Sequence, residues 1–575
     1  MYPENFLYFS NPTNELGIRI LVVHIAHNLI PYFVILTFIV LLWLVWLSWR
    51  DIADSLSRIK ARTWLILAVI FFLALGIRLY FPLHRHIIYI DEPWYLEAGK
   101  DLLTTAQQGD YPKSIGWPFL ISLFFGLFGV SNWVPIYLNI FLGAATVVPM
   151  FLFAYMITRR EDLALAASFI FSLFPAHIIW SGSAETNISS VFFILCSAYF
   201  WLLFYTQKKA KKTSNQKPHL LWLAAVSLAF CMQIRPENLV LVTLFLFGAL
   251  HYNASFRSIV LPLSVSIFLA LPNLIQVLDF HMSVDWVASD TFGNMEGLNW
   301  SISNLIDNTL AYYLLVFGST YQPIIVLPFV LAGVIIMFPR KTKEAIFITE
   351  WFVLFWLTYF SSWFQTLAGK ERFFITIYPI MAIFLVYGIY GLDNAFFARL
   401  NRPLIKQNGM LIITLSVALL FLPYVSGTSA YYADGRILET QIPEQAEKTI
   451  PKECVIIANW PTILRSSTEL RVADAQNFME SEFLRNILMN RSCVLFFEDL
   501  TCLGWDEAGL YEQCEHIKTE FNAQPFLAYS IKDNSRNSVL GNINATYTFY
   551  RLSSGKPLCA STLQKYTSPH QSMFC

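Results

Sequence analysis

The strongest candidate for chemistry in the sequence is a pair of adjacent carboxylates, Asp91 and Glu92, followed at once by Pro93, Trp94 and Tyr95. A carboxylate held beside a hydroxyl can remove its proton and so act as a general base. Pro93 also suits the first position of a helix, where Glu92 would be the N-cap. The pair is therefore a catalytic site or a helix cap, and the residue types leave open which acid would be the base.

A second set of polar and aromatic residues lies near the ends of apolar segments, where such groups are functional candidates. Cations there could hold a phosphate, because arginine makes two-pronged contacts and lysine acts as a point charge. The candidates for phosphate binding are Lys113, Arg235, Lys370 and Arg372. The other candidates for substrate binding are Arg78, Trp94, Tyr95, Tyr111, His177 and Glu185.

Each of these residues also has a purely structural interpretation. Arg78 and Arg372 could extend to lipid head groups while their stems stay in the apolar layer. Arg235 could pair with Glu237, and His177 could be a hydrogen-bonded residue of a helical bundle. Several such groups on one face, together with the acidic pair, favour a functional site.

The composition indicates a membrane protein without affinity for nucleic acid. Of the 575 residues, 56% are hydrophobic and 14% are charged, whereas soluble domains have about a quarter charged residues. The 39 basic and 39 acidic residues cancel, so no global positive field would attract nucleic acid. We expect a polytopic α-helical membrane protein.

The positions of lysine and arginine predict the topology. Basic clusters within 50–62, 159–160, 208–217, 340–343 and 399–406 belong in the cytoplasm by the positive-inside rule. About twelve apolar runs then cross the membrane, provided that the short runs 117–130 and 307–320 do not. Short runs are ambiguous, so about 11 to 14 crossings fit the pattern. Both chain ends lie on the external face in this arrangement.

The predicted domains are 1–62, with an additional first helix and a cytoplasmic loop; 63–425, the main transmembrane domain with its first external loop at 83–116; and 426–575, an external α/β domain. In the last domain, strands are expected at 454–458, 494–498 and 526–531, and helices at 481–489 and 508–521.

Six of the eight cysteines lie in this C-terminal region: Cys454, Cys493, Cys502, Cys514, Cys559 and Cys575. An even number in an external domain suggests disulfides, with fifteen connectivities open. The alternative is a set of unpaired core cysteines. The region has no C-x-x-C pair, so a zinc site is not indicated.

Several catalytic motifs are absent from the sequence: there is no GxxxxGK[ST], no GxGxxG and no HExxH. A nucleotide-driven pump and an intramembrane zinc protease are therefore disfavoured.

The order of these features resembles the GT-C superfamily of polyprenyl-phosphate-sugar-dependent glycosyltransferases, in the style of protein O-mannosyltransferases and lipid A aminoarabinose transferases. The resemblance covers about 63–392. The matching stretches are Ile77-Arg78-Leu79, Asp91-Glu92-Pro93-Trp94-Tyr95, Tyr111-Pro112-Lys113 with Trp117-Pro118, Thr158-Arg159-Arg160, Ser181 to Thr186, Arg235-Pro236, and Arg372-Phe373-Phe374 with Pro379.

The resemblance implies an inverting transfer on the external face. Asp91 would deprotonate or position the acceptor, which attacks the anomeric carbon while polyprenyl phosphate leaves. Lys113 matches a position near that phosphate, and Arg235 and Arg372 match more loosely. The first loop has no Asp-x-Asp and the tail no Trp-Trp-Asp, both of which disfavour an oligosaccharyltransferase. No cofactor is certain, and a divalent metal is possible but not indicated.

We therefore expect a multi-pass enzyme of the inner or plasma membrane that moves one hexosyl or pentosyl group from a polyprenyl-phosphate donor. Its acceptor would be a hydroxyl or similar group of an external protein or glycolipid. The alternatives are a lipid-linked oligosaccharide transferase of the same architecture, and a transporter or flippase with an external cap domain.

Overall fold

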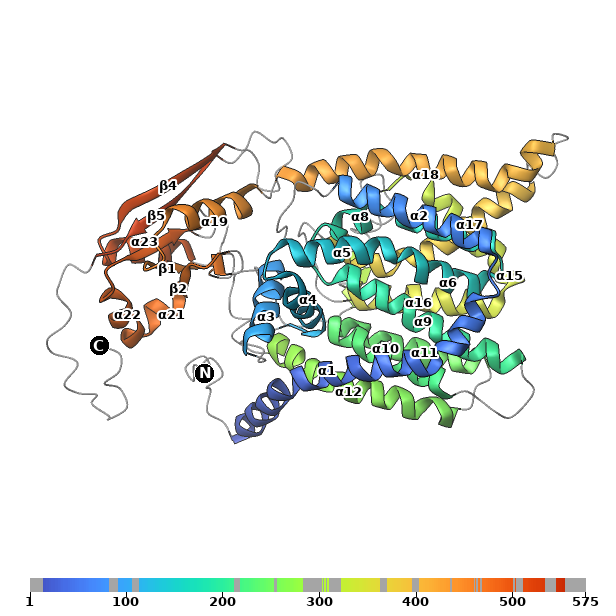
Figure 1. Cartoon of the computed structure of the whole chain (residues 1–575), viewed down its shortest axis with the longest axis horizontal. Helices are drawn as coiled ribbons and strands as arrows, with labels where there is room; N and C mark the ends of the chain where they lie inside the picture. The colour runs from blue at the N-terminus through green and yellow to red at the C-terminus, as the bar shows by residue number, and fades with distance from the viewer. Residues whose placement is uncertain are drawn as a thin grey trace. The chain divides into compact units, whose positions relative to one another are not determined.

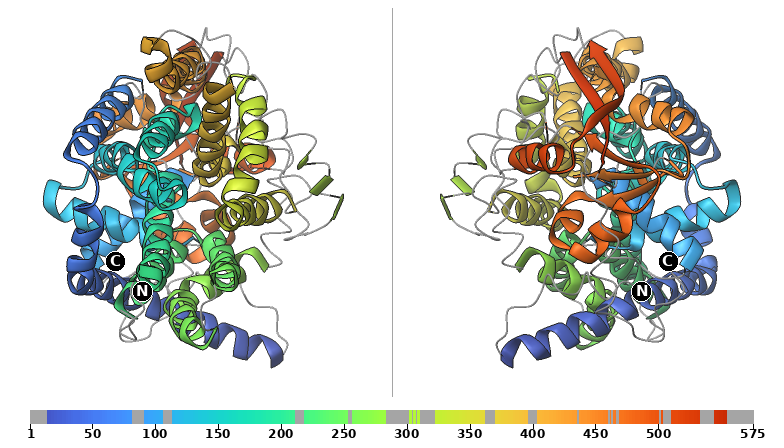
Figure 2. Two further views of the ribbon diagram at one scale, coloured as in Figure 1. Left: turned by 90° about the vertical axis from the view of Figure 1, so that its right-hand side faces the viewer. Right: turned by 90° about the vertical axis from the view of Figure 1, so that its left-hand side faces the viewer.

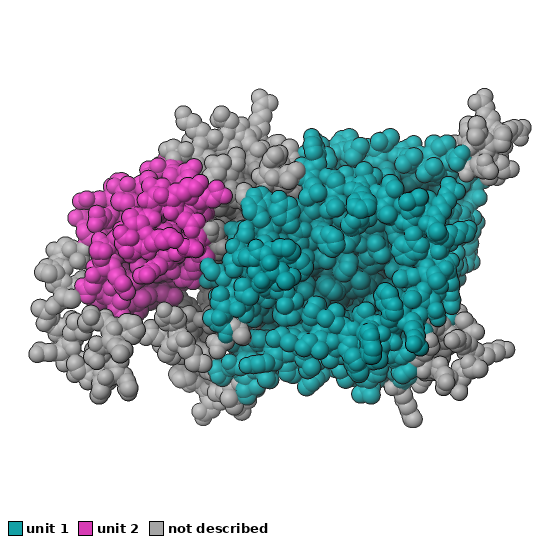
Figure 3. Space-filling view, viewed as in Figure 1, with its two compact units in different colours: residues 1–287, 296–433 teal, residues 288–295, 434–575 magenta. Residues whose placement is uncertain are grey.

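The computed structural model divides the chain into two compact units. Unit 1 comprises residues 1–287 and 296–433, and unit 2 comprises 288–295 and 434–575 (Figure 3). The structure describes residues 14–81, 91–105, 113–210, 218–252, 256–282, 302–303, 305–306, 308–309, 322–361, 370–395, 403–434, 437–459, 461, 464–465, 468–499, 502, 510–532 and 544–553.

Unit 1 is a bundle of helices that run roughly side by side, as the side view and the two end-on views show (Figures 1 and 2). In chain order its described helices are α1 (Asn14–Leu56), α2 (Ala61–Tyr80), α3 (Asp91–Thr105), α4 (Gly116–Phe128), α5 (Trp133–Ala145), α6 (Val147–Thr158), α7 (Glu161–Ser172), α8 (Pro175–Ser181), α9 (Asn187–Ala210), α10 (Pro218–Ile234), η2 (Pro236–Leu239), α11 (Val240–His251), α12 (Phe256–Met282), α15 (Val326–Arg340), α16 (Thr342–Phe360), η4 (Lys370–Thr376), α17 (Tyr378–Ala395) and α18 (Pro403–Asp434).

Among the described residues, six helical spans are long and apolar enough to cross a membrane. The count becomes seven if α7 and α8 form one span, although they are bent by 60° where Pro175 starts the second helix. Four shorter apolar helices accompany them. Large apolar side chains such as Trp46, Leu65 and Phe72 are exposed on the outside of the bundle, as lipid contact requires. About twelve crossings stays a prediction.

The helix after the acidic pair and the two short apolar runs can be compared with their predictions. Helix α3 begins at Asp91 and not at Pro93, so Glu92 lies in the first turn and is not the N-cap. Proline is tolerated there because the first N–H groups of a helix lack intrahelical partners. The run 117–130 forms α4, which is only 13 residues long, while 307–320 falls almost wholly outside the described residues.

Close packing of α15 on α17 fixes the segment that precedes α17. A Cβ atom on Gly333 would overlap the backbone of Phe384, and one on Gly388 would overlap that of Phe329. Small residues permit this close backbone approach between membrane helices. Because η4 runs directly into α17, this contact also determines where η4 lies.

Unit 2 is a three-layer α/β domain. Its sheet has the order β2-β1-β3-β5-β4, with β2, β1 and β3 parallel and β5 antiparallel to both β3 and β4. One core, on one face, contains Ile442 and Ala446 of α19; the other contains Phe478 of α21 and Ile517 of α23. The elements are α19 (Ile437–Thr449), β1 (Val455–Ala458), β2 (Arg471–Asp474), α21 (Ala475–Glu480), α22 (Glu482–Met489), β3 (Val494–Glu498), α23 (Leu510–Glu520), β4 (Gln524–Lys532) and β5 (Asn544–Arg551).

The predicted disulfides are confirmed for four cysteines. Cys454 pairs with Cys493 across 39 residues, and Cys502 pairs with Cys514 across 12 residues. Cys559 and Cys575 lie outside the described residues. The first bridge links the start of β1 to the segment before β3, so it ties together two adjacent parallel strands.

Replacing both Cys454 and Cys493 by serine should destabilise unit 2 by about 2–4 kcal/mol, because the unfolded chain gains the freedom of a long loop. Proteolysis of the full chain across a urea series, with fragments mapped to 434–575, measures this. A Cys196→Ser variant is the control, since Cys196 is free and lies in unit 1. Identical urea midpoints for the bridge variant and the wild type would contradict the expectation.

Candidate functional site

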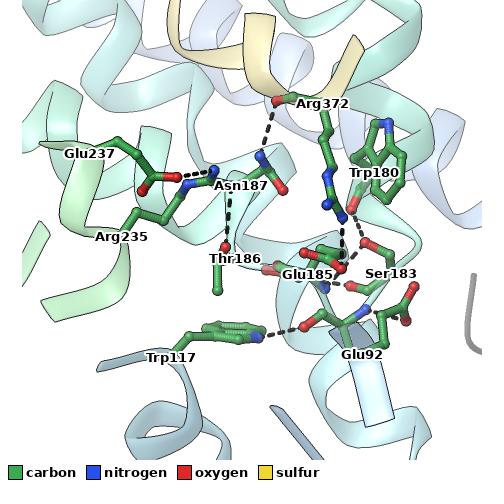
Figure 4. Close-up of polar contacts among 12 residues, drawn as sticks. Glu92, Trp117, Trp180, Ser183, Glu185, Thr186, Asn187, Arg235, Glu237 and Arg372 are labelled. Carbon is green, nitrogen blue, oxygen red and sulfur yellow. Dashed lines mark hydrogen bonds and ion pairs between the residues drawn. The ribbon is translucent and has the colours of Figure 1, made fainter. Parts of the chain in front are cut away.

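The centre of the candidate site is the turn Ser183–Asn187, which joins α8 to α9 (Figure 4). Neighbouring helices hold this backbone through buried side chains. Asn139 of α5 donates to the carbonyl oxygens of Ser183 and Glu185, each at 2.7 Å. The indole Nε1 of Trp117, in α4, donates to the carbonyl oxygen of Ala184 at 2.6 Å. The turn is therefore fixed from two sides.

A buried ion pair joins this turn to η4. Nη1 of Arg372 lies 2.9 Å from Oε1 of Glu185, and neither side chain exposes as much as a tenth of its surface. The Arg372 guanidinium also lies over the Trp180 ring at 5.5 Å. The side-chain amide of Asn187 donates to the backbone oxygen of Arg372 at 3.0 Å. Two charges in an apolar setting need this kind of direct partner, since an unpaired one would be costly.

A second guanidinium, that of Arg235, approaches the same turn from the break between α10 and η2. Its Nη2 donates to Glu237 at 2.8 Å and its Nη1 to Thr186 at 3.4 Å. The Nε atom of Arg235 is buried and has no hydrogen-bond partner in the described part of the chain. The expected pairing with Glu237 is thus present, and one buried donor remains unsatisfied.

The two arginines meet at one aromatic ring. The Cζ atom of Arg235 lies 5.2 Å from the centroid of Phe373, and that of Arg372 lies 5.1 Å from it. Both cations therefore lie within cation–π distance of a single ring. Residues 235 and 372 are far apart in sequence, so only the fold brings these cations together.

Glu92 is tied to the same turn. Its side chain is fully buried, and Oε2 accepts a hydrogen bond from the backbone N–H of Ala184 at 2.8 Å. Asp91 is the first residue of α3, and its side chain lies outside the description. One member of the acidic pair is therefore committed to holding the turn.

Lys113 lies over the aromatic residues that follow the acidic pair. Its ammonium nitrogen is 5.1 Å from the Trp94 ring centroid and 5.9 Å from that of Tyr95. The electrostatic neighbours of Arg235 include Tyr95 as well. Tyr95 thus connects the region of Lys113 to that of the two arginines, and most of the predicted cationic and aromatic candidates gather here.

Arg78 and His177 form a separate, fully buried cluster. Arg78 donates to the backbone oxygens of Ala74 at 3.0 Å and Ser172 at 3.1 Å, and to the Ser181 hydroxyl at 3.2 Å. One of its Nη atoms also contacts Nδ1 of His177. Arg78 therefore ties α2 to the bend between α7 and α8, and it is not turned to solvent or lipid.

Some predicted residues lie outside the description: Tyr111, and the side chain of Lys370. Trp117, Asn139 and Asn187 are residues of the site that sequence reasoning did not select. Asparagine inside an apolar run was the available signal for Asn139, because a buried amide in a membrane segment needs partners. In the described part of the chain, no three His, Cys, Asp or Glu residues are grouped to bind a metal ion.

Comparison with known sequences gives a partial family match. Residues 109–288 match the profile of the family described as dolichyl-phosphate-mannose-protein mannosyltransferase. A relative from Aquifex aeolicus (strain VF5), described as an uncharacterized protein, is 28% identical over 147 residues. That match covers 24% of this chain, and the chain spans only 28% of the relative's length.

Solved structures give a match over most of the chain. The oligosaccharyltransferase AglB from Archaeoglobus fulgidus, in complex with an inhibitory peptide and a dolichol-phosphate, is 14% identical with a TM-score of 0.51, covering 87% of this chain and 75% of AglB. ArnT from Cupriavidus metallidurans, bound to undecaprenyl phosphate, is 12% identical with a TM-score of 0.55, covering 86% of this chain and 98% of ArnT. Both are GT-C enzymes. The family match over residues 109–288 and these two structures together bear out the resemblance to the GT-C superfamily, and the chain has the GT-C fold.

Proposed function

We propose that this protein is an inverting membrane glycosyltransferase that moves a single sugar from a polyprenyl-phosphate donor to a hydroxyl or similar acceptor on the external face. The observation that carries the proposal is the pair of buried guanidiniums, Arg235 and Arg372, which both lie about 5 Å from the centroid of the Phe373 ring. Such an arrangement suits a phosphate whose negative charge grows as the bond to the sugar breaks.

The donors of Arg235 support its role at the phosphate. A guanidinium has five N–H donors, and Nη1 and Nη2 of Arg235 are engaged with Thr186 and Glu237 while Nε has no partner among the described residues. A buried N–H without an acceptor is unfavourable. A phosphate oxygen would supply that acceptor. Lys113, and Lys370 beside Arg372, are the proposed additional cations.

The acceptor chemistry would fall to Asp91, because Glu92 is engaged in holding the turn. In the proposed step, the acceptor O–H proton moves to the Asp91 carboxylate and the acceptor oxygen bonds to the anomeric carbon. The bond from that carbon to the phosphate oxygen breaks, and polyprenyl phosphate leaves with the electron pair. Glu92 is then a positioning residue. Trp94 and Tyr95 would face the sugar.

An apolar groove gives the prenyl chain a place. It has a volume of about 430 Å³ and runs between α1, α3 and α4, lined by Pro31, Leu102, Ile115, Phe119 and Leu127 among others. Ile115 is two residues from Lys113, so the groove opens close to the proposed phosphate site. A polyisoprenoid is a suitable occupant because the lining is almost wholly aliphatic and aromatic.

The external placement of residues 426–575 also belongs to this proposal. The two disulfides of unit 2 support it, because such bonds persist mainly in oxidising compartments. The domain division at residues 62 and 425 and the multi-pass location in the inner or plasma membrane are proposed with it.

A second candidate is transfer of a lipid-linked oligosaccharide, which the likeness to AglB favours. The absence of Asp-x-Asp in the first loop weighs against it.

A donor panel distinguishes the two functions. The purified full chain is incubated with polyprenyl-phosphate monosaccharides, a lipid-pyrophosphate oligosaccharide and an acceptor extract. Released polyprenyl phosphate and mass gained by the acceptor support the first function. Turnover only of the pyrophosphate donor would replace it with the second.

Substitutions should distinguish the catalytic role proposed for Asp91 from the positioning role proposed for Glu92. Asp91→Asn should lower turnover by about 10²–10⁴-fold, because the base is lost. Glu92→Gln should have a smaller effect, since an amide oxygen can still accept from the Ala184 N–H. Steady-state turnover with the best donor measures both, and Asp101→Asn in the same helix is the control. A larger loss in Glu92→Gln than in Asp91→Asn would reverse the two roles.

The Glu185–Arg372 pair should show strong coupling in a double-mutant cycle. Glu185→Gln or Arg372→Gln alone should cost about 3–5 kcal/mol of stability, because the remaining charge is buried without its partner. The double variant should cost less than the sum of the single changes, yet remain inactive because the cation is missing. Thermal unfolding in detergent measures stability beside turnover. If the losses of stability in the two single variants add up to the loss in the double variant, Glu185 and Arg372 are not energetically coupled.

Lys113 should act on donor binding more than on chemistry. Lys113→Gln should raise KM for the donor by about tenfold, the loss of one charge-assisted contact, with a smaller change in kcat. Lys100→Gln is the matched control, because Lys100 lies on α3 outside the proposed site. A fall in kcat at unchanged KM would instead assign Lys113 to the transition state.

A further inference from the structure

A second cavity lies at the end of the bundle opposite to the candidate site. Helix α9 runs from the candidate site to the cavity. Asn187, its first residue, contacts Arg372, whereas Tyr205 and Thr206 line the cavity. The 18 residues between Asn187 and Tyr205 span about 27 Å at 1.5 Å each, close to the hydrocarbon thickness of a bilayer. The cavity therefore lies at the other membrane boundary.

The cavity is assembled from the ends of five helices. Its volume is about 210 Å³. Its lining includes Arg58 just after α1, Arg159 just after α6, Tyr205 in α9, Tyr252 just after α11 and Glu344 at the start of α16. Residues so far apart in sequence converge here only through the bundle, as they do at the candidate site.

Two cations at the rim of this cavity lack acidic partners. Arg58 has no hydrogen bond or ion pair within the described residues, and the Arg159 guanidinium has only a 3.4 Å contact with the sulfur of Met156. Arg159 also has φ of 59°, a left-handed conformation that non-glycine residues seldom adopt. Arg159 is the C-cap of α6, a position where helices commonly adopt this conformation. Both side chains are exposed and so accessible to a ligand.

The cavity wall contains a buried phenol without a partner. Tyr205 exposes only 2% of its surface, and its hydroxyl has no hydrogen-bond partner in the described part of the chain. Its ring stacks on that of Tyr252, with centroids 5.2 Å apart and planes 20° from parallel. The hydroxyl is therefore held in place. Buried polar groups are nearly always satisfied, so the Tyr205 hydroxyl is a donor in the cavity wall that is open to an added acceptor.

The lining selects a small anion. Two arginines against the single carboxylate of Glu344 leave a net positive charge, and the phenol supplies a donor. The volume is below the roughly 300–1,000 Å³ of pockets that enclose drug-sized ligands, so a headgroup fits better than a nucleotide sugar. Basic pockets between transmembrane helices are known to suit phosphate-bearing lipid headgroups.

We propose that this cavity binds the phosphate of an anionic membrane-lipid headgroup at the boundary opposite to the candidate site. Arg58 and Arg159 contact the phosphate oxygens, the Tyr205 hydroxyl donates to one of them, and Glu344 accepts from a headgroup hydroxyl. The site is independent of the proposed transferase chemistry.

Native mass spectrometry of the purified full chain in detergent tests this, with phosphatidylglycerol, phosphatidylcholine and soluble glycerol 3-phosphate as probes. The wild type should bind phosphatidylglycerol at least about tenfold more tightly than the other two. The Arg58→Gln/Arg159→Gln variant should lose about tenfold or more in affinity for it, and Tyr205→Phe about fivefold, the loss of one hydrogen bond.

Arg62→Gln is the matched control, because Arg62 is an exposed arginine near Arg58 that does not line the cavity; its affinity should equal that of the wild type. Tyr205→Phe keeps the ring and loses only an unpartnered hydroxyl, so its fold should be unaffected. Equal binding by the wild type and the double variant would overturn the proposal. Equal affinity for glycerol 3-phosphate would overturn the lipid source and assign the cavity to a soluble phosphate ester.

Discussion

The buried pair of Glu185 and Arg372 is the interaction on which the candidate site depends. A guanidinium and a carboxylate that are both almost fully enclosed must meet directly, because neither can be stabilised by water there. Their contact fixes the Ser183–Asn187 turn against η4. The hydrogen bonds from Trp117 and Asn139 also hold the same turn. Buried charges can persist in an apolar bundle only with such mutual support.

Interruptions in the helices make this arrangement possible. Pro175 separates α7 from α8, Pro236 follows the end of α10, and η4 precedes α17. Irregular backbone at membrane depth is tolerated only where protein encloses it or a cavity opens. The breaks at Pro236 and at η4 bring Arg235 and Arg372 to the Ser183–Asn187 turn, while the opposite helix ends line the second, basic cavity. The described bundle thus has a polar turn at one end of α9 and a basic cavity near the other.

The sequence predicted the class of protein and single candidate residues better than it predicted which residues are in contact. The helical membrane class, the GT-C resemblance and the disulfides of unit 2 could all be predicted. Strands β1, β3 and β4 were expected, but β2 and β5 were not: Arg471–Asp474 is a four-residue edge strand with charged ends, and Asn544–Arg551 has few aliphatic residues. Strand propensity depends on neighbours that only the folded sheet provides.

The site was harder to predict because its members come from separate elements. Arg78 and Arg372 looked alike in sequence, as single arginines in apolar segments. The structure distinguishes them. Arg78 donates hydrogen bonds to two backbone oxygens, whereas the guanidiniums of Arg372 and Arg235 both lie near the Phe373 ring. Glu92 likewise looked equivalent to Asp91 until its bond to Ala184 separated the two. Pairwise geometry of this kind requires the fold, because residues far apart along the chain must be brought together.

If Arg235 holds the phosphate of the lipid carrier as proposed, equilibrium binding of polyprenyl phosphate without a sugar should depend on its guanidinium. The affinities of wild-type protein, Arg235→Gln and the control Arg62→Gln would be compared under one detergent condition. Binding by Arg235→Gln should be weaker by about tenfold or more, because a charge-assisted hydrogen bond is lost, and the control should bind as the wild type does. Equal affinity in all three proteins would contradict it.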